Sequence, residues 1–136
     1  MIRDLARFRS LRFAPVLPEE SQVNPGCHGA ELAFWLCTRL YQEHRIATSY
    51  PENEDWGWLL SYFTEKGSEF AVHCRNIDGD NSLWLISLRR DGRGFFWRKK
   101  PSFGCAGALV AALASLLEAE EGITELEWLW VDGDDS

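Results

Sequence analysis

The chain has 136 residues, a formal net charge of -7 and 46% hydrophobic residues, which fits one soluble domain with a sizeable core. No apolar run reaches the ~18 residues of a membrane span, and the start lacks the apolar stretch of a signal peptide, so we expect a cytoplasmic protein without membrane contact. The negative charge argues against nucleic acid as a partner, since phosphate binding needs a dominant basic field. Four cysteines without a Cys-x-x-Cys spacing indicate reduced thiols rather than a disulfide framework.

The first 23 residues predict an extended arm. They contain Pro15 and Pro18, and proline lacks the amide donor of an inner strand, so at most an edge strand is expected, around Phe8 to Phe13. Asn24 and Pro25 then provide a helix N-cap and a first helical position, and the helix is expected to run to about His44. Its apolar stripe consists of Ala30, Ala33, Phe34, Cys37, Leu40 and Tyr41.

The most informative segment runs from Asp55 to Phe63 and is apolar on both faces of the expected strand. A strand from Glu69 to Asn76 follows it, and a pairing of Tyr62 with Phe70 makes the even-numbered side the core face. A strand that is apolar on both faces implies that something buries the second face, and a partner protein is one candidate.

The remaining elements complete the predicted architecture. A further strand is expected from Ser82 to Leu88, a helix from about Phe103 to Glu120 and a last strand from Ile123 to Val131. Residues 132–136 are predicted to be a disordered acidic tail. Residues 1–131 are therefore expected to form a single α+β domain: an antiparallel meander sheet of about four to five strands, with two helices packed on one face as a two-layer sandwich.

One motif carries a resemblance. The sequence Glu54-Asp55-Trp56-Gly57-Trp58, preceded by a helix that opens at Asn24-Pro25-Gly26, resembles a group of small uncharacterised bacterial proteins with an acid-Asp-Trp-Gly-Trp strand. The similarity covers roughly residues 22–88. It implies a bacterial cytosolic origin and carries no activity or residue role.

The leading functional hypothesis is a non-enzymatic interaction protein, either a homodimer or a module that binds another protein. Exposed apolar patches of more than a few hundred Å² rarely occur on soluble monomers. The second face of the sheet is the expected contact, and its candidate interface residues are Leu59, Phe63, Trp84 or its neighbour Leu85, and Phe96.

The alternative hypothesis, from another class, is a small-molecule binding protein or a small hydrolase. Carboxylates beside aromatic rings are a common arrangement for binding sugars or cations. The candidate ligand-binding residues are Glu52, Glu54, Asp55, Trp56 and Trp58. Packing of the tryptophans in the core, with the acids solubilising a turn, explains the same residues.

Thiol and metal chemistry receive little support from the sequence. Cys27 and Cys105 each lie three residues after an expected helix N-cap, where the helix dipole lowers a thiol pKa. No spacing ties a histidine to either thiol, so no catalytic residue is assigned and the question of enzyme activity stays open. The adjacent His73 and Cys74 would point to opposite faces of a strand, so neither a metal site nor a cofactor is expected.

Overall fold

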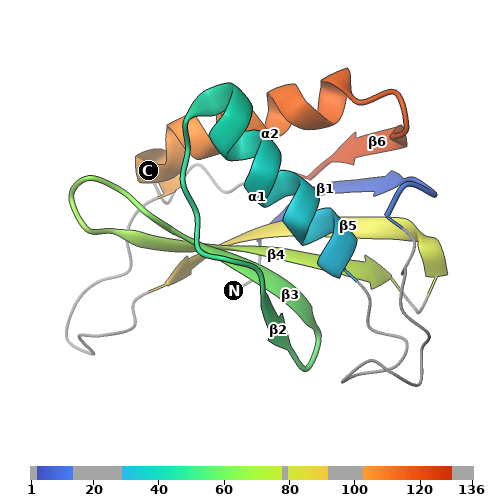
Figure 1. Cartoon of the computed structure of the whole chain (residues 1–136), viewed down its shortest axis with the longest axis horizontal. Coiled ribbons are helices and arrows are strands. Elements are labelled where there is room, and N and C mark those ends of the chain that lie inside the picture. The colour runs from blue at the N-terminus through green and yellow to red at the C-terminus, as the bar shows by residue number, and fades with distance from the viewer. Residues whose placement is uncertain (1–2, 14–28, 78–79, 92–102, 130–136) are drawn as a thin grey trace.

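A computed structural model describes residues 3–13, 29–77, 80–91 and 103–129. The elements in chain order are β1 (Arg3–Arg9), α1 (Ala30–His44), β2 (Glu52–Glu54), β3 (Gly57–Phe63), β4 (Glu69–Ile77), β5 (Asp80–Asp91), the 3-10 turn η2 (Phe103–Ala106), α2 (Gly107–Ala119) and β6 (Thr124–Trp128). Both helices lie on the same side of one sheet (Figure 1). The predicted α+β class is confirmed, whereas the described residues form an antiparallel sheet of six strands, in the order β2-β3-β4-β5-β1-β6, rather than of four to five.

The predicted register of the central hairpin is confirmed. Tyr62 pairs with Phe70 and Trp58 pairs with Cys74 across β3 and β4. The even-numbered positions of both strands face the helices, as the alternation of Phe70, Val72 and Cys74 predicted.

The N-terminal segment corrects the sequence prediction. Instead of an arm with an edge strand around Phe8 to Phe13, β1 is an inner strand between β5 and β6. Its Leu5, Ala6 and Phe8 are buried in the core, which favours the inner position. Pro15 and Pro18 follow the strand in the sequence and therefore remove no amide donor from it. Among the described strands, β2 and β6 are the outermost.

Helix boundaries differ at the N-terminal ends. The helix α1 begins at Ala30, because Gly29 adopts a non-helical φ of 148°; the expected start at Asn24 and Pro25 lies outside the described residues. The helix ends at His44 as predicted, and the left-handed Arg45 donates its backbone N–H to the carbonyl of Tyr41. The α2 helix begins four residues later than expected, because η2 occupies Phe103–Ala106.

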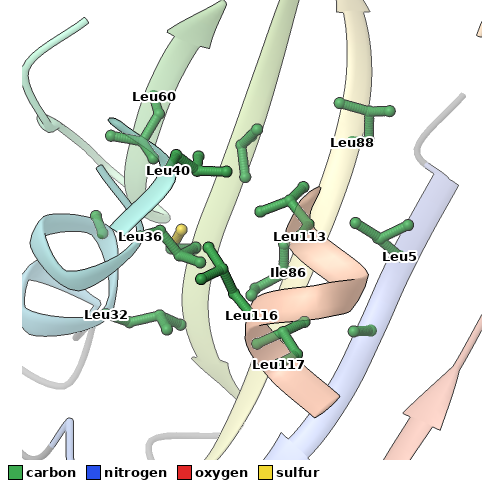
Figure 2. Close-up of a cluster of buried hydrophobic side chains, with 14 of the residues drawn as sticks. Leu5, Leu32, Leu36, Leu40, Leu60, Ile86, Leu88, Leu113, Leu116 and Leu117 are labelled. Atoms are coloured by element: carbon green, nitrogen blue, oxygen red, sulfur yellow. The ribbon is translucent and has the colours of Figure 1, made fainter. Parts of the chain in front are cut away.

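Leucines from both helices interdigitate with the sheet to form the core (Figure 2). The indole of Trp84 is fully buried beside them, and its N–H donates to the carbonyl oxygen of Ser10 at 2.9 Å. Neither helix in the described ranges combines the length and the hydropathy that crossing a membrane requires. The labelled core residues in Figure 2 are Leu5, Leu32, Leu36, Leu40, Leu60, Ile86, Leu88, Leu113, Leu116 and Leu117.

Candidate functional site

The second face of the sheet, on the side away from the helices, is a mixture of apolar and polar side chains. Leu59 lies opposite His73, and His73 lies opposite Ser87, so an apolar residue begins a row that continues with polar ones. Leu59 and Leu85 are only 7% and 5% exposed within one chain. The apolar surface predicted here is therefore already buried at these two leucines.

Trp56 and Trp58 point to opposite sides of the sheet. Trp58 packs against the core with α1, whereas the Trp56 ring stacks on the His73 imidazole at 4.1 Å between centroids and 11° between planes. In a regular strand, positions 56 and 58 would share a face. The turn before β3 breaks this alternation, because Gly57 has a φ of 155° and lies against the backbone of β4.

Two hollows flank the stacked rings. The larger, of about 310 Å³, extends toward the end of β5, and a smaller one of about 190 Å³ lies on the side of Arg75 and Ser87. Trp56, His73 and Arg89 border both. The described residues around the larger hollow are Glu54, Trp56, Leu59, Ala71, His73, Arg89 and Arg90.

A second feature is an exposed group of aromatic rings where α1 meets the chain that enters β2. The Phe34 ring meets the Tyr50 ring edge-on, with 5.5 Å between the ring centroids. It also lies tilted beside the Trp58 ring, with 6.4 Å between the centroids. Tyr41 follows Phe34 by seven residues on α1 and therefore lies on nearly the same side of the helix. We call Phe34, Tyr41, Tyr50 and Trp58 the aromatic surface.

Hydrogen bonds fix the backbone that presents Tyr50. Ser49 donates its N–H to the Ser61 carbonyl and accepts the Ser61 N–H on its own hydroxyl, both at 2.8 Å. The thiol of Cys37, on α1, donates to the Ser49 carbonyl. Tyr50 is thereby connected to both β3 and α1.

The predicted ligand-binding residues are divided among three places. Glu54 and Trp56 border the larger hollow. Glu52 and Asp55 are exposed, on β2 and in the β2–β3 turn, and Trp58 belongs to the aromatic surface. Arg89 and Arg90 of β5 also border the larger hollow but were not part of the prediction. They lie near the β2–β3 turn only because of the register of the folded sheet.

The predicted interface residues also have different environments. Leu59 and Leu85 are buried on the second face, and Phe63 is 59% exposed at the end of β3. Of the alternatives Trp84 and Leu85, Trp84 lies on the core face and Leu85 on the second face. Phe96 lies outside the described residues.

The thiols of the described residues are not paired with one another. Burial raises the pKa of the Cys74 thiol far above its usual range, which keeps it protonated and unreactive. Cys105 is exposed in η2, and the helix proper begins after it at Gly107. Cys27 lies outside the described residues. Within the described ranges, no group of three or more His, Cys, Asp or Glu side chains is arranged to hold a metal ion.

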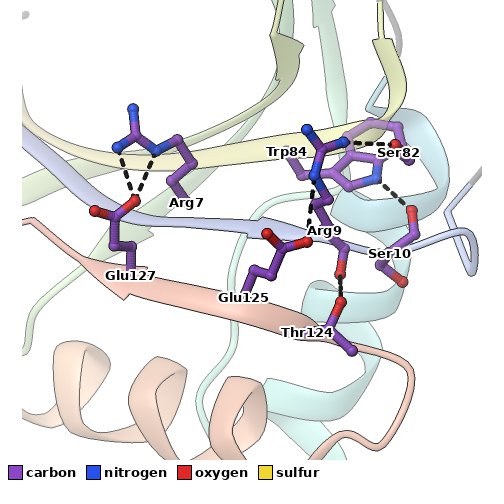
Figure 3. Close-up of polar contacts among 8 residues, drawn as sticks. All are labelled: Arg7, Arg9, Ser10, Ser82, Trp84, Thr124, Glu125 and Glu127. Carbon is purple, nitrogen blue, oxygen red and sulfur yellow. Dashed lines mark hydrogen bonds and ion pairs between the residues drawn. The ribbon is translucent and has the colours of Figure 1, made fainter.

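Charged pairs connect the terminal strands (Figure 3). Arg7 donates to one carboxylate oxygen of Glu127 through Nε at 3.2 Å and Nη2 at 2.8 Å. Arg9 lies 3.3 Å from the Glu125 carboxylate and donates to the Ser82 hydroxyl on β5. Arg7 and Arg9, which lie in the segment predicted to be an extended arm, therefore connect β1 to both of its neighbours.

Comparison of the chain with protein-family models, with curated proteins and with solved structures finds no significant match.

Proposed function

We propose that this chain is a protein-interaction module that binds its partner through the aromatic surface. Phe34 is 41% exposed and Tyr50 is 77% exposed. Aromatic side chains supply much of the binding energy at protein interfaces, because each ring buries a large area and loses few rotamers. The clustering of these exposed rings is the observation that carries the proposal.

The aromatic surface is held in place before any partner arrives. Phe34 packs against both Tyr50 and Trp58, and Tyr50 follows the doubly hydrogen-bonded Ser49. Rings that are already packed lose less conformational entropy on binding than rings that move freely. This preorganisation favours a recognition role.

Polar side chains surround the aromatic surface. Thr38 lies between Phe34 and Tyr41 on α1 and is exposed, and the Arg45 guanidinium lies 5.9 Å from the Tyr41 ring centre. An apolar centre with a polar rim is the usual anatomy of a protein interface. A second copy of the chain and a different protein both fit this chemistry. A cytoplasmic location and a bacterial origin stay predictions from the sequence.

Site-specific photocrosslinking tests the proposal. We would replace Tyr50 with p-benzoylphenylalanine, irradiate the host cells and measure the mass of the products. The matched control carries the same group at Phe63, which is an exposed aromatic residue at the end of β3. We expect a product from position 50 and none from position 63. A product of twice the chain mass indicates self-association, and any other mass indicates a different protein.

Substitutions test the same surface by affinity. Phe34→Ser and Tyr50→Ser should each weaken partner binding by about thirtyfold or more, since aromatic hot spots of an interface contribute about 2 kcal/mol or more. Phe63→Ser should leave binding unchanged. Loss of binding in Phe63→Ser alone would instead place the interface at Phe63, one of the residues that the sequence predicted on the second face of the sheet.

A further inference from the structure

We propose that the hollows beside Trp56 and His73 bind a small organic anion that carries a flat ring. The larger hollow, of about 310 Å³, has the size of a small-molecule site. It lies on the second face of the sheet, whereas the aromatic surface lies where α1 meets the chain before β2. The two sites are therefore separate.

The charge of the lining favours an anion over the cation or sugar that the sequence suggested for Glu52, Glu54 and Asp55. Arg89 and Arg90 border the larger hollow and Arg75 borders the smaller one, against the single carboxylate of Glu54 among the described lining residues. Guanidinium groups bind carboxylates and phosphates through paired, charge-assisted hydrogen bonds. Arg89 is the central group, because it borders both hollows.

The apolar part of the lining favours a ring. The Trp56 indole borders both hollows and is held flat against His73 at 4.1 Å. Leu59 and Ala71, both buried, line the larger hollow beside it. A flat apolar group can pack against this rigid indole and these aliphatic side chains while its charged group reaches Arg89.

Two pairs of probes test the proposal by calorimetric titration. Each pair consists of an anion and its uncharged counterpart with the same ring: adenosine monophosphate with adenosine, and indole-3-acetate with indole-3-acetamide. We expect at least one anion to bind about tenfold or more tightly than its counterpart, the size of one hydrogen bond to a charged group. A larger affinity ratio of anion to counterpart in the nucleotide pair assigns the charged group as phosphate, and a larger ratio in the indole pair assigns it as carboxylate.

Variants locate the bound anion. Arg89→Gln should weaken binding about tenfold or more, whereas Arg89→Lys should retain part of the affinity. The matched control is Arg7→Gln, which removes a charge from the same sheet face where the arginine already pairs with Glu127. Trp56→Ala should also weaken binding, with Trp128→Ala on the edge strand β6 as its control. Trp56→Phe keeps a ring at the site and should bind better than Trp56→Ala.

Several outcomes would overturn the proposal. One is the absence of binding by all four probes at millimolar concentration, and another is equal affinity of each anion and its uncharged counterpart. A loss of affinity in Arg7→Gln as large as in Arg89→Gln would show general charge attraction rather than a site. Circular dichroism of each variant separates loss of the site from loss of the fold.

Discussion

Gly29 and Gly57 approach the same carbonyl oxygen, that of Cys74 in the middle of β4. A Cβ atom would lie 2.6 Å from this oxygen at Gly29 and 2.8 Å from it at Gly57. Gly29 precedes α1, which carries Phe34 of the aromatic surface, and Gly57 follows Trp56. One peptide group of β4 therefore sets the position of both candidate binding features.

Substitution of Gly57 by alanine tests this close approach. The new methyl group would collide with the Cys74 carbonyl and the Arg75 side chain, and the φ of 155° is unfavourable for alanine. We expect Gly57→Ala to lower the free energy of unfolding by about 1–3 kcal/mol. Gly107→Ala is the control, because nothing lies within 4 Å of the added atom at the start of α2. Equilibrium unfolding in urea measures both, and equal stability of the two variants would contradict the interpretation.

Trp84→Phe should destabilise the core. The change removes the indole N–H that donates to the Ser10 carbonyl at 2.9 Å and leaves unfilled volume at a fully buried position. We expect a loss of about 2–4 kcal/mol in the free energy of unfolding. The control Trp128→Phe, on the edge strand β6, should change stability by less than about 0.5 kcal/mol. A loss below 1 kcal/mol for Trp84→Phe would show that the core repacks.

Cys74 should make the fold less stable at alkaline pH. Burial raises the pKa of its thiol in the folded state, whereas in the unfolded chain the thiol ionises near pH ~8.5. Below that pH both states bind the proton and the thiol has no pH-dependent effect. Above it the unfolded state loses the proton first, so the free energy of unfolding falls by about 1.4 kcal/mol per pH unit.

Unfolding curves between pH 8 and pH 10 measure this slope. Cys74→Ala should lower the slope by the amount that one thiol contributes, although the variant loses some stability at every pH because it leaves a small cavity. Cys105→Ala, at an exposed position, should keep the slope of the parent chain. An identical slope in Cys74→Ala and the parent would contradict the role of Cys74. In the native protein, a thiol reagent should label Cys105 rapidly and Cys74 only as fast as the chain unfolds.

The ion pair between Arg7 and Glu127 should contribute little to stability. The two side chains are 43% and 62% exposed, so water and salt screen their attraction. A double-mutant cycle with Arg7→Ala and Glu127→Ala should give a coupling free energy below about 1 kcal/mol, and it should decrease in 1 M salt. A coupling above 2 kcal/mol that persists in salt would mean that the pair acts as a buried one.

The sequence predicted the elements whose register depends on local patterns. Val72 and Cys74 alternate with polar residues, and a short turn connects β3 to β4, so pairing and core face were both predictable. The inner position of β1 was not, because the arm was predicted from Pro15 and Pro18, and the carboxylates that pair with Arg7 and Arg9 lie near the other end of the chain.

The candidate sites were predictable only in part. Trp56 was recognised, but its separation from Trp58 depends on the backbone of Gly57, which residue types alone do not reveal. Arg89 is far from Trp56 along the chain and reaches it through the register of β4 and β5. Tyr50 received no role from the sequence, because its contact with Phe34 depends on the path of the chain between α1 and β2.

The position of β1 between β5 and β6 has a consequence for synthesis on the ribosome. Of the described strands, β1 is translated before the others, its two neighbours in the sheet are translated much later, and its contact with β6 spans 120 residues along the chain. Until β5 and β6 have been translated, Leu5 and Phe8 cannot be buried as they are in the folded chain. Chaperones can bind these exposed side chains, and the side chains can also promote aggregation. The nascent chain can assemble the β2-to-β5 meander first, and β1 is enclosed between β5 and β6 last.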